Sequence, residues 1–397
     1  MVRGDGSPSI PGAPLRRGYV VQDRIGNAIL RVTDGLLERV LARGPSPRRP
    51  IRRLLLSNGR HLGDVVISTS LLPLIKAALP EVEIGMLVGS WSRPVVEKHS
   101  MLSYVHSLDH WKLDRSTSSL DARLGRYRRT RRAALQQIRA VGYDAAVELL
   151  GFFPNAIPVL WQARIPVRVG YGTGGFGPML THNVVWSDSN RHIAEYQVDL
   201  LRVLGVPVVS DGALCPVLPA GPEAAIRSAR EKVGGADASY VVVHMGSGLD
   251  LKEWPLERWT TVVAELARKG HRVVLTGQGE RERENARVVV EAAPRVVDLV
   301  GELSWAEFVE VLRSAQVLIC VDSVAGHVAA AEGVPTVVLM AGLTNPHHWR
   351  PLGERVWALT NAVPCAPCYR GGGCPGMECI RDIPEKRVLA AFELAMG

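Results

Sequence analysis

The chain has 397 residues, of which 47% are apolar types, and it carries a net charge of +8. This size is typical of two domains that each bury a core of their own. No run approaches the about 18 apolar residues of a membrane-spanning helix, and the N-terminus lacks the apolar core of a signal peptide, so we expect a cytoplasmic protein. The positive charge favours an anionic partner, such as a nucleotide-sugar, a membrane surface or nucleic acid.

Residues 1–50 are predicted to form an N-terminal extension. Residues 23–43 within it carry apolar side chains at the spacing of an amphipathic helix, namely Ile29, Leu30, Val32, Leu36, Leu37, Val40 and Leu41. A basic amphipathic helix can lie on a membrane. Packing on the protein's own domain is the favoured alternative, and peripheral contact with the inner membrane surface stays open.

The first core strand is predicted at residues 51–56, and a glycine and a carboxylate follow it. Gly63 permits a tight turn and the close approach of a ligand, and Asp64 opens a helix that is predicted to run to Leu79. A carboxylate at a strand-to-helix turn lies at the carboxyl edge of the sheet, where open α/β folds bind their ligands. The alternative is that Asp64 only caps the helix.

The segment of residues 123–139 is very basic. Such a run is usually a solvated helix face, and an anion-binding face is the alternative. Nucleic acid is not expected as a partner, because no recognised binding motif and few aromatic residues accompany these charges.

The second half begins with a predicted strand, residues 240–244, and a glycine-rich turn follows it. Ser247 and Gly248 lie in this turn, and Lys252 follows a few residues later. This pattern suits a diphosphate, because the N–H groups of such a turn and an ammonium group both attract anions. Glu280 follows the next predicted strand, where it can accept hydrogen bonds from a ribose or simply cap a helix.

The clearest local unit is a strand, a helix and a strand over residues 317–346. Asp322 and Ser323 end the first buried strand and are good N-cap residues, and His327 lies one helical turn further on. This arrangement requires a right-handed crossover in a parallel sheet. The helix N-terminus offers N–H groups and the positive end of its dipole to a phosphate. An ordinary strand–helix–strand unit with a capping Asp is the alternative.

Strands and helices alternate in both halves, which predicts an α/β protein. We expect two doubly wound, Rossmann-like parallel-sheet domains facing across a cleft. The N-terminal domain is predicted at residues 51–215, the C-terminal domain at 216–375 and a helical tail at 376–397. The ligand is expected between the domains, at the carboxyl ends of strands.

Four groups of motifs occur in a specific order along the chain. They are Leu-Gly-Asp-Val at 62–65, His-x-Gly-Ser-Gly and Lys-x-Trp-Pro within 244–255, Thr-Gly-Gln-Gly-Glu at 276–280, and Val-Asp-Ser-x-x-x-His, Gly-Val-Pro-Thr-Val-Val-Leu and Thr-Asn-Pro within 321–346. Together they resemble glycosyltransferase family 9, the heptosyltransferases of the lipopolysaccharide inner core and their relatives, over roughly residues 51–397. The resemblance implies a GT-B fold, and transfer of a heptose from an ADP-activated donor with inversion and without a catalytic metal or other cofactor.

The resemblance also implies roles for single residues, carried over position by position. Asp64 matches the catalytic base, which takes a proton from the acceptor hydroxyl. Lys252 matches the lysine that pairs with the donor diphosphate and stabilises the leaving charge. The other donor-binding positions are Gly63, Ser247, Gly248, Glu280, Asp322, Ser323 and His327.

The resulting prediction is an inverting glycosyltransferase with an ADP-heptose-like donor and a saccharide or glycolipid acceptor, in lipopolysaccharide or cell-surface glycan synthesis. The same chemistry on a natural-product or protein acceptor is one alternative. Another nucleotide-sugar enzyme is a second alternative, because paired Rossmann-like domains also serve epimerases and dehydrogenases. The turn after the first core strand lacks Gly-x-Gly-x-x-Gly, which argues against a dinucleotide site there.

Four of the six cysteines cluster near the C-terminus, at Cys365, Cys368, Cys374 and Cys379. In a cytoplasmic protein such a cluster favours a structural zinc or iron over disulfides. The second pair lacks the usual two-residue spacing, so free thiols and a regulatory disulfide are alternatives. The other two, Cys215 and Cys320, are predicted to be buried small apolar residues.

Overall fold

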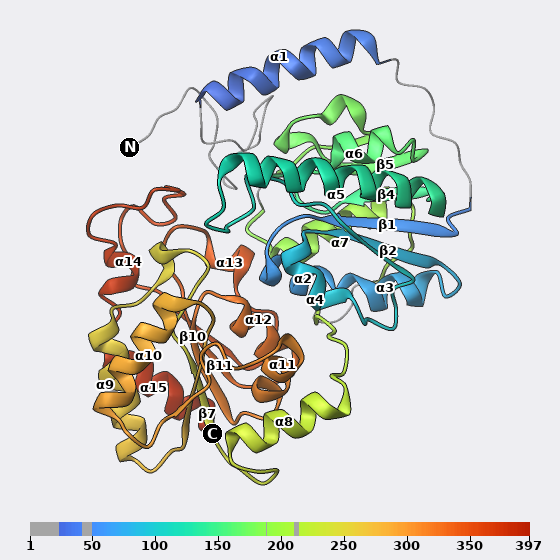
Figure 1. The fold of residues 1–397 in the computed structure, drawn as a ribbon. Coiled ribbons are helices and arrows are strands. Elements are labelled where there is room, and N and C mark those ends of the chain that lie inside the picture. Colours follow the sequence, from blue (N-terminus) through green and yellow to red (C-terminus); the bar gives the residue numbers. More distant parts are fainter. Residues whose placement is uncertain (1–23, 42–49, 188, 210–213) are drawn as a thin grey trace. The chain divides into compact units, whose positions relative to one another are not determined.

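A computed structural model of the chain describes residues 24–41, 50–187, 189–209 and 214–397. These residues form two compact units that divide between Leu214 and Cys215, one residue before the domain boundary given by the sequence. Each unit contains a parallel six-stranded sheet with helices packed against it (Figure 1). The predicted fold class of two doubly wound parallel sheets is therefore confirmed. The remainder of the N-terminal extension, residues 1–23 and 42–49, lies outside the described residues.

The first sheet has the strand order β3-β2-β1-β4-β5-β6. Its strands are β1 (Arg53–Asn58), β2 (Glu83–Val88), β3 (Tyr104–Ser107), β4 (Ala145–Glu148), β5 (Val167–Tyr171) and β6 (His182–Val184). Leu54, Leu55 and Leu56 of the central strand β1 are fully buried, as expected for a parallel strand covered on both faces. The chain order reverses between β1 and β4, which is the switch point where open α/β sheets bind ligands.

Helices cover both faces of the first sheet. They are α2 (Leu62–Ser68), α3 (Leu71–Ala78), α4 (Arg93–Val96), α5 (Leu120–Val141), α6 (Ile157–Gln162) and α7 (Ile193–Val203), with short 3-10 turns η1 (Ser90–Ser92), η2 (Gly172–Gly174) and η3 (Gly177–Met179). Apolar side chains of α5 and α6 pack in one core with those of the central strands. α2 and α3 both contact α7, so each face of the sheet is shielded from water by its own helices.

The prediction of a single helix from Asp64 to Leu79 is wrong in one respect, because the structure has two helices there. The hydroxyls of Thr69 and Ser70 donate to the carbonyls of Val66 and Ile67, each at 2.7 Å, which favours a local turn over a continuous helix. Pro73 has no N–H to donate to the carbonyl of residue 69, so the helical ladder is interrupted there. α3 restarts at Leu71.

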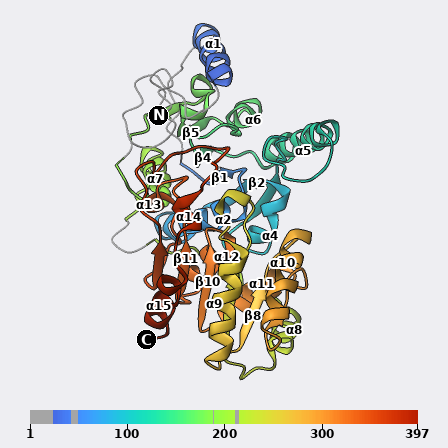
Figure 2. The same cartoon turned by 90° about the vertical axis from the view of Figure 1, so that its left-hand side faces the viewer.

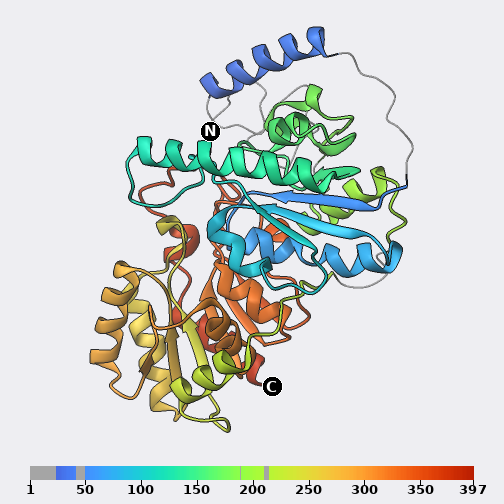
Figure 3. The ribbon, with the colours of Figure 1, turned by 45° about the vertical axis from the view of Figure 1, so that its right-hand side comes forward.

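The extension contains one described helix, α1 (Arg24–Val40), which contacts η3 of the first unit. Figure 3 shows α1 in blue beside this unit. Leu30 is buried against Gly175, and the carboxylate of Asp34 accepts a hydrogen bond from the Phe176 N–H at 2.9 Å. This side of the helix therefore packs on the protein's own domain, which is the favoured alternative. Among the described residues, no helix has both the length and the apolar character needed to span a membrane.

The second sheet has the strand order β12-β11-β10-β7-β8-β9. Its strands are β7 (Val241–His244), β8 (Val273–Thr276), β9 (Val297–Asp298), β10 (Val317–Val321), β11 (Thr336–Leu339) and β12 (Val356–Leu359). The unit over residues 317–339 has the predicted strand, helix and strand, with β10 paired in parallel with β11. β7 is the other neighbour of β10, so the turns that follow these two strands lie side by side.

The helices of the second unit are α8 (Glu223–Val233), α9 (Leu256–Arg268), α10 (Glu280–Ala292), α11 (Trp305–Arg313), α12 (Val324–Ala331), α13 (Pro346–Trp349), α14 (Glu378–Arg381) and α15 (Glu385–Met396), with a 3-10 turn η4 (Asp250–Lys252). Figure 2 shows α9 and α15 against one face of the sheet. Val388 and Phe392 of α15 belong to the apolar core of this unit. The segment 376–397, given by the sequence as a separate tail, thus contributes to the second core.

Candidate functional site

In the first unit, the candidate site follows β1 at the carboxyl edge of the sheet. Asp64 is the third residue of α2, and its Oδ2 accepts a hydrogen bond from the His61 N–H at 3.2 Å. The Asn58 amide donates to the Asp64 carbonyl at 3.0 Å and to the Ser68 hydroxyl at 2.8 Å, which ties the strand end to the helix. Asp64 is therefore a helix cap, and it is also partly exposed, which leaves its carboxylate accessible for chemistry.

Two arginines that the sequence reasoning missed lie near Asp64. Burial lowers the pKa of both Arg60 and Arg115, and the charge of Asp64 opposes that shift in each case. The Arg60 guanidinium lies 5.3 Å from the centre of the Phe152 ring, and the carbonyl of Arg60 accepts a hydrogen bond from the Trp91 indole at 2.8 Å. These contacts hold a cation beside the candidate base. Within the described residues, Arg60 forms no ion pair with a carboxylate.

A buried carboxylate, Glu148, ends β4 next to β1. Its Oε2 accepts hydrogen bonds from the Ser57 hydroxyl and the Ala156 N–H, both at 2.9 Å. Burial raises the pKa of Glu148 from 4.5 to about 7, although these hydrogen bonds and the charge of Arg60 oppose the shift. Glu148 was also missed from the sequence, because only the parallel pairing of β1 with β4 brings it to this edge.

Glu148→Gln is expected to flatten the loss of stability at rising pH. A carboxyl whose pKa is raised in the folded state contributes stability that is full below pH 4.5 and is lost as the pH rises through about 7. The amide oxygen of Gln can accept the same two hydrogen bonds without charge. The free energy of unfolding of the variant should gain on the wild type by on the order of 2 kcal/mol between pH 5 and pH 8. Urea denaturation at both pH values measures this, and parallel curves for the two proteins would contradict it.

In the second unit, three segments meet at the carboxyl ends of β7 and β10. The Lys252 ammonium, on η4, lies 2.6 Å from Oδ2 of Asp322, which follows β10. The Ser247 hydroxyl, in the turn after β7, donates to the Asp322 carbonyl at 3.4 Å and accepts from the Leu249 N–H at 3.3 Å. Gly248 is exposed in the same turn. The structure thus brings together Ser247, Gly248, Lys252 and Asp322, which are separated by up to 75 positions in the sequence.

The helix α12 begins at this same edge. Ser323 is its N-cap with extended backbone angles, and the Ser323 hydroxyl is buried without a hydrogen-bond partner among the described residues. His327 is buried one turn later. A buried hydroxyl without a hydrogen-bond partner is costly unless a ligand or water supplies one. The free N–H groups of the first turn of α12 point towards the same end of the helix. This corner of the second unit is therefore suited to an anionic group.

Glu280 is separated from this cluster by its orientation. It is exposed at the start of α10, and its nearest ion pair is with Arg283 of the same helix at 3.4 Å. The next residue of α10, Arg281, reaches the segment after β7 instead, where it forms ion pairs with Asp250 and Glu253. Sequence reasoning missed Arg281, because the motif that marked this region ends one residue before it.

Glu282 is the carboxylate of α10 that lies against the glycines. A Cβ atom built on Gly246 or Gly277 would lie within 2.3 Å of a Glu282 carboxylate oxygen, so a larger residue at either position would displace this side chain. Glu282 also accepts a hydrogen bond from the Gln278 N–H at 3.0 Å, and burial raises its pKa. The nucleoside-side role given to Glu280 stays a prediction, and Glu282 is the better placed carboxylate at this turn.

The four clustered cysteines lie close together, since Cys365, Cys368 and Cys374 all act on the pKa of Cys379. The described residues contain no group of three or more His, Cys, Asp or Glu side chains that could hold a metal ion. Burial, and then the neighbouring Cys368, Cys374 and Cys365, raise the pKa of Cys379. Cys320 is buried as predicted, whereas Cys215 is exposed, so that prediction is wrong.

A structural zinc or iron at the cluster therefore stays a prediction. If the four thiols close around one ion, the purified full chain should contain nearly one zinc or iron per molecule, and Cys368→Ser should lose it while Cys215→Ser keeps it, because four ligands complete a tetrahedral site. Elemental analysis of the three proteins measures this. A metal-free wild type with all six thiols titratable would end the idea.

Comparisons with known proteins bear on what this arrangement does. The family model "Glycosyltransferase family 9 (heptosyltransferase)" matches residues 131–373, which is more than half of the chain. The chain is 25% identical to lipopolysaccharide heptosyltransferase 3 of Escherichia coli, over 75% of this chain and 87% of the relative. It is 26% identical to lipopolysaccharide heptosyltransferase 1 of Pseudomonas aeruginosa, over 80% of this chain and 86% of the relative.

Solved structures agree on the fold. The crystal structure of the family 9 glycosyltransferase from Veillonella parvula is similar with a TM-score of 0.70 and 21% identity, covering 87% of this chain and 97% of that one. The structure of the E. coli ADP-heptose lipopolysaccharide heptosyltransferase II is similar with a TM-score of 0.67 and 20% identity, covering 87% and 98%. The predicted GT-B class with two Rossmann-like domains is thus confirmed. The chain belongs to glycosyltransferase family 9, and it is a glycosyltransferase.

Proposed function

We propose that this chain transfers a heptose, or a related sugar, from an ADP-activated donor to a hydroxyl of a saccharide acceptor in lipopolysaccharide synthesis. The observation that carries the proposal is the cluster of Ser247, Lys252 and Asp322 beside the buried Ser323 hydroxyl. It joins one cation and one helix N-terminus at the strand ends of the second unit. Relatives named lipopolysaccharide heptosyltransferases, matched over three quarters or more of this chain, support the choice of sugar and pathway.

The second unit is proposed to bind the donor. Lys252 would pair with the diphosphate, with Asp322 holding its ammonium in place at 2.6 Å. The N–H groups at the start of α12 and of the Ser247–Gly248 turn would supply further donors. These fixed positive groups stabilise the charge that builds on the diphosphate as its bond to the sugar breaks. Because the protein itself supplies this charge, the proposed reaction needs no catalytic metal.

Asp64 of the first unit is proposed to act as the general base. Its carboxylate would take the proton from the acceptor hydroxyl while that oxygen forms a bond to the anomeric carbon and the diphosphate leaves as ADP. A single displacement of this kind inverts the configuration at the anomeric carbon. Arg60 and Arg115, whose charges interact with Asp64, are suited to hold an anionic acceptor. A lipid-linked saccharide would bring the chain to the cytoplasmic face of the membrane.

A panel of nucleotide-sugars tests the choice of donor. An ADP-heptose at one hundred times its dissociation constant should stabilise the protein by about 2.7 kcal/mol, which corresponds to a rise in melting temperature of about 5–10 °C. UDP-, GDP- and CMP-sugars should raise it much less, because their bases differ. Thermal denaturation with each donor measures this. A UDP-sugar that protects more strongly than every ADP-sugar would point to another nucleotide-sugar enzyme.

A further inference from the structure

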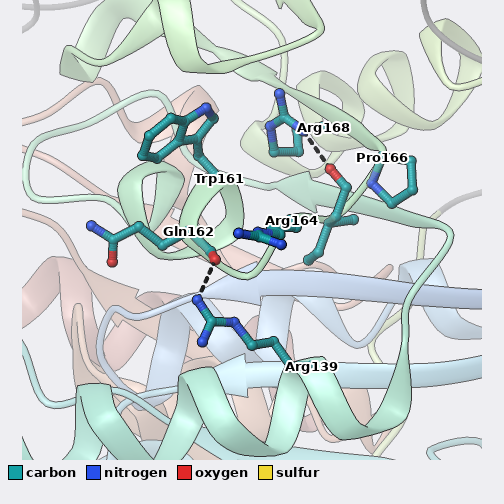
Figure 4. Close-up of a pocket in the computed structure, with 7 residues that line it drawn as sticks. Arg139, Trp161, Gln162, Arg164, Pro166 and Arg168 are labelled. Atoms are coloured by element: carbon teal, nitrogen blue, oxygen red, sulfur yellow. Dashed lines mark hydrogen bonds between the residues drawn. The ribbon is translucent and has the colours of Figure 1, made fainter.

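The first unit has a hollow that the proposed reaction does not use. Its volume is about 580 Å³, and it lies where α5 and α6 end and β5 begins (Figure 4). Three arginines line it, Arg139 from α5, Arg164 from the turn after α6 and Arg168 from β5, together with the indole of Trp161. A hollow with three guanidinium groups and one aromatic ring is a candidate for an anionic ligand.

The hollow lies at the opposite edge of the sheet from Asp64. It is lined by Pro166 and Arg168 at the start of β5, whereas Asp64 follows the end of β1. All strands of this sheet run parallel, so the start of one strand and the end of another lie at opposite edges. The arginines are therefore not part of the proposed transfer site.

The positive charge of the hollow is not neutralised by the protein. Arg139 donates to the Gln162 carbonyl at 2.8 Å, and Arg168 donates to the Met179 carbonyl at 2.7 Å and to the Ile165 carbonyl. Backbone carbonyls orient these guanidinium groups but carry no net charge. No ion pair joins Arg139, Arg164 or Arg168 to a carboxylate of the described chain. A phosphate group would offer oxygens to all three.

The helix α1 presents an apolar stripe to solvent. Ile29, Val32, Leu36 and Val40 are 59%, 65%, 56% and 78% exposed, and their spacing places them along one side of the helix. The exposed charged residues Arg31, Glu38 and Arg39 belong to the same helix, and Arg39 lies beside the stripe. Leaving four aliphatic side chains in water is costly, and an amphipathic helix with basic residues beside an apolar stripe is typical of binding to a membrane interface.

The helix α1 and the hollow adjoin the same turn, η3. Asp34 of α1 binds the Phe176 N–H at the start of this turn, and Arg168 binds the Met179 carbonyl at its end. α6 also contacts η3, and Figure 1 shows α1 on the same side of the unit as α6. The helix that carries the apolar stripe and the basic hollow thus both border one turn of the first unit.

We propose that this region of the first unit docks on an anionic membrane, with the α1 stripe in the interface and a phospholipid headgroup phosphate in the arginine hollow. The two features complement the two layers that a membrane surface offers, apolar chains and anionic phosphates. A second copy of the chain is a poorer occupant, because each copy carries a net charge of +8 and would bring arginines against arginines. The proposal goes beyond sugar transfer and does not depend on it.

Vesicle co-sedimentation of the full chain tests the proposal. The chain should bind phosphatidylcholine vesicles that contain phosphatidylglycerol, bind vesicles of phosphatidylcholine alone far more weakly, and dissociate as salt is raised. Removing two charges from the hollow with Arg139→Gln and Arg164→Gly should weaken binding about 30-fold, at roughly fivefold for each charge. Glycine suits position 164, where φ is 60°. Val32→Glu with Leu36→Glu should weaken binding at least as much.

Matched variants of the second unit keep the proposal falsifiable. Arg227→Gln with Arg268→Gln removes two charges whose side chains are 66% and 71% exposed, and Val288→Glu with Leu394→Glu changes two exposed apolar residues. Both control pairs should bind vesicles like the wild type, apart from a small effect of net charge. Equal vesicle binding by the test pairs and the control pairs would overturn the proposal. Inorganic phosphate that raises the melting temperature as much as vesicles do would also overturn it. Self-association that Leu36→Glu abolishes, without vesicle binding, would assign the stripe to a second copy instead. Donor-induced thermal protection, measured on the same variants, should be unchanged and keeps failure of docking distinct from failure of donor binding.

Discussion

Replacing Asp64 with Asn is expected to reduce sugar transfer by about 10²–10⁴-fold, the usual contribution of a general base, while donor binding stays nearly intact. Asn has the size of Asp but cannot accept a proton from the acceptor hydroxyl. Its amide oxygen can still accept the hydrogen bond from the His61 N–H, which Asp64 makes at 3.2 Å. The change in folding stability should therefore be small, well below the about 1 kcal/mol typical of losing a helix cap.

The chain offers a matched control for the capping role of Asp64. Glu195 occupies the same position of α7, where it accepts a hydrogen bond from the N–H of another N-cap histidine, His192, at 3.1 Å. Glu195→Gln should leave transfer within a few-fold of the wild type. Initial rates with a saturating donor and donor affinity by calorimetry separate the two variants. Full activity in Asp64→Asn, or equal losses in both variants, would show that Asp64 is only a cap.

Replacing Lys252 with Ala is expected to weaken donor binding by about 10–100-fold, because a charge-assisted contact to a buried phosphate is worth roughly 1.5–3 kcal/mol. Transfer should slow further, since the same ammonium stabilises the leaving diphosphate. The variant also leaves the buried carboxylate of Asp322 without its partner at 2.6 Å, and this costs folding stability. Loss of stability alone must therefore be distinguished from loss of donor contact.

Lys232 provides that distinction. Its ammonium lies 2.7 Å from the carboxylate of Glu307, and its side chain is 31% exposed against 25% for Lys252. Lys232→Ala should lower stability to a similar extent without changing donor affinity. The double variant Lys252→Ala with Asp322→Asn should regain stability but not donor binding. Unchanged donor affinity in Lys252→Ala, or equal loss in Lys232→Ala, would remove Lys252 from the diphosphate site.

The local elements could be predicted from sequence wherever hydrophobic runs were bounded by strong capping residues. β10, α12 and β11 are examples, because Asp322 and Gly333 mark their limits within a short apolar segment. The break between α2 and α3 was not foreseen, since Thr69 and Ser70 read as ordinary helix residues until their hydroxyls bond back to the preceding carbonyls. Propensity does not reveal such local competition.

The candidate site was predictable only in part, for a different reason. Motif positions such as Ser247 and Lys252 carry their own signal in the order of residues. Arg60 and Glu148 do not, because their proximity depends on the pairing of β1 with β4 across 91 positions. Glu280 and Glu282 differ in burial because positions two apart on a helix face different directions, and the sequence alone does not say which of them faces the turn after β7.

The most direct test of the central claim is the anomeric configuration of the transferred sugar. We propose a single displacement in which Asp64 deprotonates the acceptor and the diphosphate bound by Lys252 leaves. Nuclear magnetic resonance of the glycoside formed from an ADP-heptose should therefore show a configuration opposite to that of the donor, and Asp64→Asn should yield almost no product. A product with the donor's configuration, or transfer that does not need Asp64, would contradict this account.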